Sequence, residues 1–248
     1  MNDKVLWVTG ASSGIGAAVA NKFANKGWKV AVSARREELL DELAKHENIF
    51  SYPLDVTDAI KLKEVFNKIV NDLGKVDLCI LSSGTYERKS EKEIDVNNIR
   101  NVIEVNFLGV INSVGAVESY FKNKNSGHIA IVSSPVGYRG LPKSSGYTPS
   151  KAALNNFTQG IYFDFIKYNV RVSLICPGFI KTALTDKNEF KMPFLKSPEY
   201  AADKIYDGLI NKKSFEIIFP LQIAIIYKIF QILPNRIYNY LISKFVNR

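Results

Sequence analysis

The chain has 248 residues, 46% of them hydrophobic, which is enough for one sizeable core and short for two independent domains. Its 33 lysines and arginines exceed its 24 acids, giving a net charge of +9, but the charges are interleaved, which favours a solvated surface over a nucleic-acid-binding one. With only two cysteines there is no disulfide framework, which favours a reducing, cytoplasmic setting.

In chain order, short apolar runs alternate with longer segments of helical periodicity. The runs are hydrophobic along their whole length, as strands buried on both faces are. Their alternation with helices predicts a parallel sheet covered on both faces, with ligands bound beyond the carboxyl ends of the strands. The expected strands are 5–10, 28–34, 76–84, 127–134 and 170–178, and the expected helices are 14–26, 36–46, 57–73, 97–122 and 148–168.

A glycine-rich turn, TGASSGIG, stands between the first expected strand and helix. Glycines allow a tight turn and close approach of a pyrophosphate to the helix N-terminus, although such turns also occur as plain loops. The letters also match the nucleophile elbow of hydrolases with Ser12 as nucleophile, but that elbow needs several strands before it and only nine residues precede Gly10. We therefore expect cofactor contacts from Gly10, Ser12, Ser13, Gly14, Ile15 and Gly16.

Two arginines, Arg35 and Arg36, follow the second expected strand in SARR. NAD enzymes of this architecture commonly carry an acid here for the ribose 2′-hydroxyl, whereas an arginine accommodates the 2′-phosphate of NADP. A guanidinium forks onto a phosphate, so the pair favours NADP(H) over NAD(H). The alternative is that both arginines only cap or solvate the next helix.

Tyr147 and Lys151 in YTPSK lie one helical turn apart if a helix begins near Thr148, a start that Pro149 in the first turn fits. Work as an acid or base near neutral pH asks for a tyrosine pKa shift of roughly 3 units, about 4 kcal/mol, and one ammonium about 4 Å away supplies roughly that. A serine hydroxyl nearby, Ser134 at the preceding strand end, can hold a substrate oxygen.

Three other tyrosines, at 120, 200 and 240, also have a lysine four residues on, so the spacing alone is not decisive. Only Tyr147 has a serine at a strand end thirteen residues before it. The same offset from the other three falls on Phe107, Lys187 and Tyr227.

As a set, TGASSGIG, LDV, the asparagine of VNFLG, a serine before YxxxK and PGFIKT resemble the short-chain dehydrogenase/reductase superfamily over about residues 4–220. The resemblance implies an α/β, three-layer Rossmann fold with a doubly wound parallel sheet of about seven strands. It implies an oxidoreductase that interconverts a carbonyl and a secondary alcohol, forms a homodimer or homotetramer, and uses no metal; the two arginines favour NADP(H) as its cofactor. The branch that acts on lipids and sterols is the most similar.

Carried over residue by residue, the resemblance implies that Tyr147 donates and accepts the proton, while Lys151 lowers its pKa and binds the nicotinamide ribose. Ser134 would position the substrate carbonyl, and Asn106 would hold a water that links Lys151 to solvent. The further cofactor contacts that it implies are Asp55 and Val56 at the adenine, Gly84, and Pro177, Gly178, Ile180 and Thr182 towards the nicotinamide.

One motif departs from the family pattern, because LSSG at 81–84 replaces Asn-Asn-Ala-Gly. Gly84 is kept, so the backbone can still approach the cofactor. The hydrogen bonds of the asparagines must be replaced or lost, since Leu81 and Ser82 stand in their places.

After the core (1–182) we expect a substrate lid with the last helix over 183–215, beginning with the polar, proline-containing stretch 183–200. Its apolar Met192 and Phe194, with Leu195, suit a hydrophobic substrate. They suit packing of the lid on the core equally well.

An apolar, basic extension is expected over 217–248, where acids are absent. Its first part is too interrupted for a bilayer-spanning helix, and the part after Pro234 predicts a basic amphipathic helix. Such a helix fits peripheral contact with an anionic membrane, and it fits a dimer contact or a cover for the core equally well. The predicted apolar face carries Ile237, Leu241, Ile242, Phe245 and Val246, and the polar face Asn235, Arg236, Asn239, Ser243 and Asn247.

A protein of another class remains as the rival: a scaffold or sensor that binds NADP(H) without chemistry. The set of Asn106, Ser134, Tyr147 and Lys151 disfavours it, because a pure binder needs no proton relay.

Overall fold

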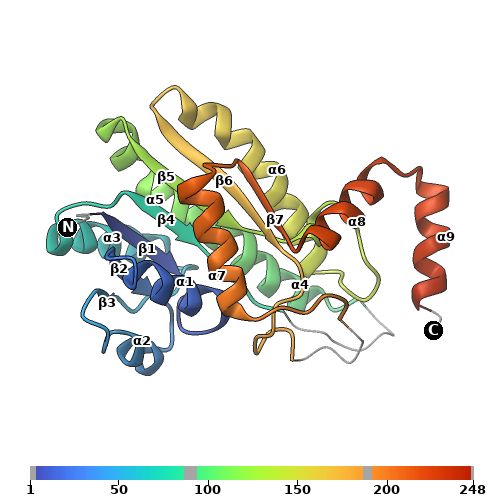
Figure 1. Ribbon diagram of the computed structural model, residues 1–248, viewed down its shortest axis with the longest axis horizontal. Coiled ribbons are helices and arrows are strands. Elements are labelled where there is room, and N and C mark those ends of the chain that lie inside the picture. The colour runs from blue at the N-terminus through green and yellow to red at the C-terminus, as the bar shows by residue number, and fades with distance from the viewer. Residues whose placement is uncertain (1–3, 87–93, 187–191, 247–248) are drawn as a thin grey trace.

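The computed structural model describes residues 4–86, 94–186 and 192–246, and its centre is a parallel sheet in the order β3-β2-β1-β4-β5-β6-β7 (Figure 1). The order reverses at β1, which pairs with β2 on one side and β4 on the other, so the sheet is doubly wound as expected. The strands are β1 (Val5–Thr9), β2 (Lys29–Ser33), β3 (Ile49–Ser51), β4 (Leu78–Leu81), β5 (Gly127–Val132), β6 (Val170–Pro177) and β7 (Glu216–Phe219).

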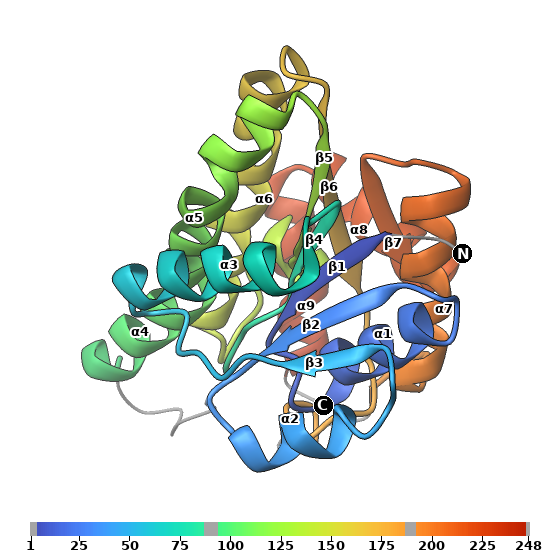
Figure 2. The ribbon, with the colours of Figure 1, turned by 90° about the vertical axis from the view of Figure 1, so that its left-hand side faces the viewer.

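The helices form a layer on each face of the sheet (Figure 2). Alternate β1 side chains serve the two layers: Leu6 and Val8 pack in the core with α1 and α7, while Val5 and Trp7 pack in the core with α3, α5 and α6. The helices are α1 (Gly14–Ala24), α2 (Glu37–Leu43), α3 (Ala59–Leu73), α4 (Val96–Ile103), α5 (Gly109–Lys124), α6 (Tyr147–Ile166), α7 (Pro198–Tyr206), α8 (Leu221–Ile232) and α9 (Asn235–Val246).

The expected helix 97–122 is divided in the structure. A π-helical segment, Glu104–Leu108, joins α4 to α5 and carries Asn106. Such a segment widens one turn and is often found at functional sites, and a periodicity count does not reveal it. The continuous helical stretch 96–124 is long and apolar enough to cross a membrane by length and composition, but it contributes α5 to the helical layer and its core.

Two strands were not expected individually. The strand β3 has three residues, too few for a period to show. Residues 217–219 were assigned to the C-terminal extension, and this was wrong, because they belong to β7, which pairs with β6 from Leu174↔Glu216 to Pro177↔Phe219. The extension proper therefore begins after Phe219 and consists of α8 and α9, which lie at one end of the molecule (Figure 1).

Candidate active site

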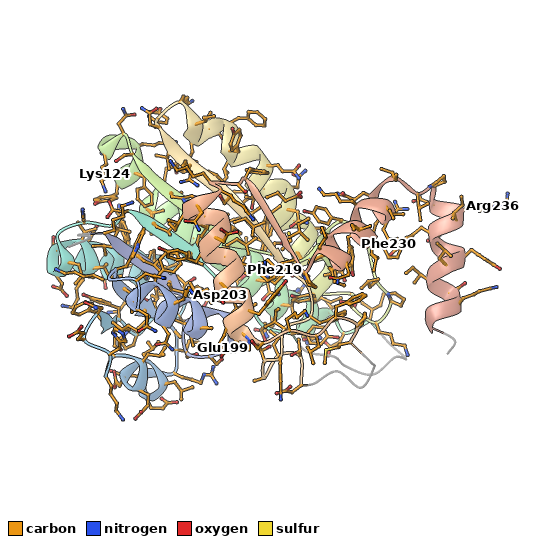
Figure 3. All side chains as sticks on the ribbon, viewed as in Figure 1. Lys124, Glu199, Asp203, Phe219, Phe230 and Arg236 are labelled. Carbon is orange, nitrogen blue, oxygen red and sulfur yellow. The ribbon has the colours of Figure 1, made fainter. Side chains whose placement is uncertain are left out.

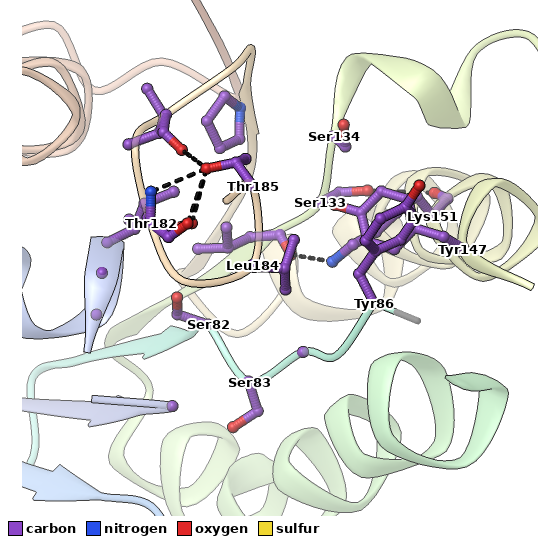
Figure 4. Close-up of a pocket in the computed structure, with 18 of the residues that line it drawn as sticks. Ser82, Ser83, Tyr86, Ser133, Ser134, Tyr147, Lys151, Thr182, Leu184 and Thr185 are labelled. Atoms are coloured by element: carbon purple, nitrogen blue, oxygen red, sulfur yellow. Dashed lines mark hydrogen bonds between the residues drawn. The ribbon is translucent and has the colours of Figure 1, made fainter. Parts of the chain in front are cut away.

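A cavity of about 450 Å³ lies at the carboxyl ends of the strands, where the fold predicts a ligand. The glycine-rich turn, the ends of β4 and β5, the start of α6 and the loop after β6 all contribute to its wall (Figure 4). The predicted residues that line it are Gly10, Ser12, Ser13, Gly14, Ile15, Gly16, Arg35, Arg36, Asp55, Val56, Gly84, Ser134, Tyr147, Lys151, Pro177, Gly178, Ile180 and Thr182.

The glycine-rich turn packs closely on the backbone around it. Gly10 has φ +67°, and a Cβ there would lie 2.7 Å from the carbonyl oxygen of Ser82 and from the backbone nitrogen of Ser83. A Cβ on Gly16 would lie 2.4 Å from the carbonyl oxygen of Gly10. The backbone of Ser82 also donates a hydrogen bond to the Thr9 carbonyl oxygen, 3.3 Å away. The LSSG stretch is thus joined to the turn by backbone contacts.

Gly10→Ala should therefore lower the free energy of unfolding by more than the loss of glycine's conformational freedom would alone. Left-handed strain and the clash with backbone together predict a loss of about 3 kcal/mol or more in the free energy of unfolding. Gly27→Ala is the matched control, because Gly27 has φ +79° with nothing near its Cβ position, and should lose only about 1 kcal/mol. Urea unfolding of both variants checks this, and equal losses would mean that close approach at Gly10 contributes nothing.

The serine hydroxyls of the glycine-rich turn accept hydrogen bonds from an arginine. Arg36 Nη2 donates hydrogen bonds to Ser12 Oγ and Ser13 Oγ, each at 2.8 Å. Arg36 stands at the N-cap of α2, yet its side chain makes no capping bond, so the alternative that it only caps this helix is not supported. Arg35 instead lies near Asp55, with 3.8 Å between Nη1 and Oδ2. The result is an exposed cluster of two guanidinium groups and two hydroxyls at one end of the cavity.

The arrangement does not support the hydrolase alternative for Ser12. His46 Nε2 lies 3.1 Å from Asn25 Oδ1, and His128 Nε2 lies 2.9 Å from Ser173 Oγ. Neither histidine lines the cavity, so neither can act as a base on the Ser12 hydroxyl.

The loop after β6 closes the other side of the turn. A Cβ on Gly14 would lie 2.9 Å from Thr182 Cγ2, so the two segments touch. Thr185 Oγ1 donates to the carbonyl oxygens of Ile180 and Thr182 and accepts from Thr182 N at 2.9 Å, which fixes this loop (Figure 4). Thr185 was not predicted, since a threonine that braces a loop has no pattern of its own.

Ser134, Tyr147 and Lys151 meet at the cavity wall. Tyr147 is the first residue of α6 and Lys151 lies one turn later, as the proline in the first turn predicted. Ser134 follows β5 and caps a short 3₁₀ turn, accepting a hydrogen bond from Val136 N at 3.4 Å. Lys151 is buried, donates from Nζ to the Val132 carbonyl oxygen at 3.1 Å, and lies 5.6 Å from the centroid of the Tyr147 ring. Figure 4 shows the tyrosine and lysine side by side.

The pKa values of this pair differ from the expectation for Tyr147. Burial raises the pKa of Tyr147 to about 12, although a hydrogen bond with Ser134 opposes the rise. Burial also lowers the pKa of Lys151 to about 8. The expected lowering of the Tyr147 pKa by Lys151 is thus not found, because burial of the phenol raises its pKa. At neutral pH Tyr147 holds its proton, as a proton donor must.

Asn106 is fully buried behind the cavity and does not line it. Its Oδ1 accepts from Thr85 N at 2.6 Å, and its Nδ2 donates to the Thr85 carbonyl oxygen and to Ser150 Oγ. A Cβ on Gly84 would lie 3.5 Å from Asn106 Oδ1 and 3.9 Å from Lys151 Nζ, so the three residues are neighbours. These bonds tie Asn106 to the segment after β4, and its role in holding a water that links Lys151 to solvent stays a prediction.

The substrate end of the cavity differs from the expectation. Met192 and Phe194 do not line it, and Phe194 is 43% exposed, so their assignment as substrate residues finds no support. Residues 187–191 of the expected lid lie outside the described part. The lining residues that were not predicted include Tyr86, Val136, Leu141, Pro142, Leu184, Ile223 and Tyr227. The Tyr86 ring packs edge-on against Tyr147, with 5.3 Å between centroids.

A doubly wound sheet with a glycine-rich turn, Tyr147 and Lys151 on one cavity is typical of an oxidoreductase, and the comparison with known proteins supports this class. The sequence profile of the short chain dehydrogenase family matches residues 4–192, and the chain belongs to this family. An uncharacterized oxidoreductase of Myxococcus xanthus is 32% identical over 244 residues, 96% of each chain. The 3-oxoacyl-[acyl-carrier-protein] reductase FabG of Thermotoga maritima is 34% identical over 197 residues, 75% of this chain and 78% of that protein.

Two solved structures are similar throughout. A short-chain dehydrogenase from Streptomyces avermitilis superposes with a TM-score of 0.80 at 25% identity, covering 91% of this chain and 90% of that one. ElxO with NADP bound superposes with a TM-score of 0.77 at 27% identity, covering 87% and 97%.

Proposed function

We propose that the protein is an NADP(H)-dependent oxidoreductase that interconverts a carbonyl and a secondary alcohol, with a hydrophobic compound as substrate. The observation that carries this is the convergence of Ser134, Tyr147 and Lys151 on one cavity with the glycine-rich turn. A protonated phenol beside a serine hydroxyl suits a carbonyl oxygen that gains negative charge.

In this mechanism the nicotinamide supplies or accepts the hydride. The Ser134 hydroxyl holds the carbonyl oxygen by a hydrogen bond, and Tyr147 transfers its proton to that oxygen. Lys151, held by Val132, places positive charge near the phenolate that forms. Because Lys151 is buried, solvent screens this charge little.

The preference for NADP(H) rests on the arginine cluster at the other end of the cavity. A bound phosphate would accept hydrogen bonds from Arg36, either in place of Ser12 and Ser13 or together with them. Arg35 lines the same part of the cavity. The NADP bound to the similar ElxO supports this assignment.

Arg36→Ala should weaken NADPH binding about tenfold to a hundredfold, since one charge-assisted hydrogen-bonding group to a phosphate is lost. The dissociation constant for NADH should change by only a few-fold, since NADH lacks that phosphate. Fluorescence titration with both nucleotides measures this, with the exposed Arg100→Ala as a charge-matched control. Equal losses for the two nucleotides would assign Arg36 a structural role instead.

The hydrophobic substrate is proposed from the side chains around the catalytic pair. Leu141, Leu184 and Ile223 line the cavity together with Tyr147 and Tyr227. Apolar walls with few polar groups favour apolar ligands. The similarity to FabG points the same way, towards acyl-type carbonyls.

A screen of NADPH and NADH oxidation tests the proposal, with ketosteroids, 3-ketoacyl thioesters, long-chain ketones and small sugars as substrates. We expect turnover with NADPH and a hydrophobic carbonyl, and little with sugars. Tight NADPH binding without turnover on any carbonyl would favour the scaffold or sensor.

We propose a homodimer or homotetramer in the cytoplasm. The support is an apolar surface on α6, where Phe163 is 71% exposed and Ile166 50%. Sedimentation velocity of the purified chain tests this assembly.

A further inference from the structure

Helix α8 has two apolar faces with different surroundings. Ile223 and Tyr227 point inward, are buried, and line the cavity that holds Tyr147. A second row of side chains recurs at helical spacing on the opposite side and is exposed. It consists of Leu221 (71% exposed), Ile225 (52%), Ile229 (48%) and Ile232 (81%).

The position of α8 is fixed by contacts with the body of the protein. Lys228 Nζ lies 2.6 Å from Glu216 Oε2 at the start of β7. Arg139 Nη2 donates to the Leu233 carbonyl oxygen at 2.8 Å, and its guanidinium lies 4.5 Å from the centroid of the Tyr238 ring. The aliphatic row is therefore presented outward from an anchored helix.

Helix α9 is held beside α8 by its inner face. Tyr238 is buried, donates from its hydroxyl to the Gly140 carbonyl oxygen at 2.6 Å, and packs on Phe230 of α8. Its outer flank exposes Ile237 (48%) and Tyr240 (58%) next to Arg236 and Lys244. Figure 3 shows Arg236 directed away from the body and Phe230 between the helices.

The charged side chains that follow Glu216 all have one sign. No acid follows Glu216 in the sequence, whereas Lys228, Arg236, Lys244 and Arg248 do. Aliphatic and tyrosine side chains bordered by lysine and arginine match the interface of an anionic bilayer, where acyl chains meet negative headgroups. An isologous contact between two copies of this patch would instead bring together two surfaces with the same sign of charge.

We propose that the α8–α9 patch, defined as Leu221, Ile225, Ile229, Ile232, Ile237 and Tyr240 with Arg236 and Lys244, docks on the surface of an anionic membrane. In the docked protein the outer face of α8 contacts lipid, while Ile223 and Tyr227 on its inner face line the cavity. If the proposed function holds, docking places the cavity next to the bilayer in which a hydrophobic carbonyl dissolves. The docking itself does not depend on that function.

Vesicle cosedimentation tests the docking, with phosphatidylcholine alone or mixed with phosphatidylglycerol. Wild type should bind the anionic vesicles more strongly, and salt should weaken the binding. The double variant Arg236→Gln/Lys244→Gln should lose about five-fold in partition coefficient for each cation removed. The double variant Ile225→Gln/Ile229→Gln should lose about ten-fold or more, because two apolar side chains no longer enter the interface.

Ile60→Gln serves as the matched control, since Ile60 is 76% exposed on α3, and it should bind like wild type. Glutamine retains helix propensity, and circular dichroism checks that each variant is folded. Tyr147→Phe should also bind vesicles like wild type, so failure of the catalytic proposal and failure of docking are distinguishable. The proposal is overturned if wild type does not sediment with anionic vesicles, or if both double variants of the patch bind these vesicles as strongly as wild type. It is also overturned if the Ile225→Gln/Ile229→Gln variant instead dissociates an oligomer in sedimentation velocity.

Discussion

Replacement of Tyr147 by phenylalanine should lower the turnover of carbonyl reduction at least about a thousand-fold while NADPH binding stays within a few-fold. The phenylalanine ring keeps the packing against Tyr86 but has no proton to give. The raised pKa of Tyr147, about 12, means that the wild-type phenol is protonated at neutral pH, so the variant loses a donor present in nearly every molecule. Single-turnover oxidation of NADPH, beside fluorescence titration of the nucleotide, separates the two effects.

Tyr200→Phe is the control for this prediction. Tyr200 also precedes a lysine by four residues, and Lys204 lies 5.5 Å from the centroid of its ring. It belongs to α7 and does not line the cavity, so turnover should be unchanged. Full activity of Tyr147→Phe, or an equal loss in Tyr200→Phe, would contradict the assignment of Tyr147 as proton donor.

Lys151→Met should separate activity from stability. We expect turnover to fall about a hundred-fold or more, because positive charge near the developing phenolate is lost. The free energy of unfolding at pH 7 should rise by about 1–2 kcal/mol. The pKa of Lys151 is about 8 in the fold and 10.5 as its ordinary value, so the folded protein bears the cost of a buried charge at pH 7. The lost hydrogen bond to Val132 offsets part of this gain.

The sign of the pH dependence follows from the same two pKa values. Between about pH 8 and 10.5 the unfolded chain holds more protons on Lys151 than the folded protein, so wild-type stability gains from this group as pH rises. The advantage of Lys151→Met should therefore shrink over that interval. Urea unfolding at several pH values measures it, with the exposed Lys63→Met on α3 as control. If the free energy of unfolding of Lys151→Met exceeds that of wild type by a constant amount, or falls below it, Lys151 is not a buried charge that destabilises the fold.

The convergence of the candidate catalytic residues on one cavity could be predicted because local chain geometry brings them together. Tyr147 and Lys151 are one turn apart on α6, and Ser134 ends the neighbouring strand, so the parallel sheet places all three at one edge. Arg36 was also predicted at the cofactor, since the ends of β1 and β2 are adjacent in the sheet. A sequence can predict such contacts, because they follow from the spacing within one motif or from the pairing of neighbouring strands.

The substrate side could not be predicted in the same way. Ile223 and Tyr227 reach the cavity only because α8 folds back after β7, and no local pattern specifies that return. Met192 and Phe194 were selected by composition alone. The pKa of Tyr147 was predicted in the wrong direction because an ammonium about 4 Å away was assumed and the burial of the phenol, which raises its pKa, was not counted.

Transfer of label from NADPH deuterated at both C4 positions tests the central claim most directly. With a hydrophobic carbonyl that supports turnover, mass spectrometry should find one deuterium at the carbinol carbon of the product alcohol, and none should form with Tyr147→Phe. Tight binding of the labelled NADPH with no labelled alcohol from any carbonyl of the panel would contradict the account.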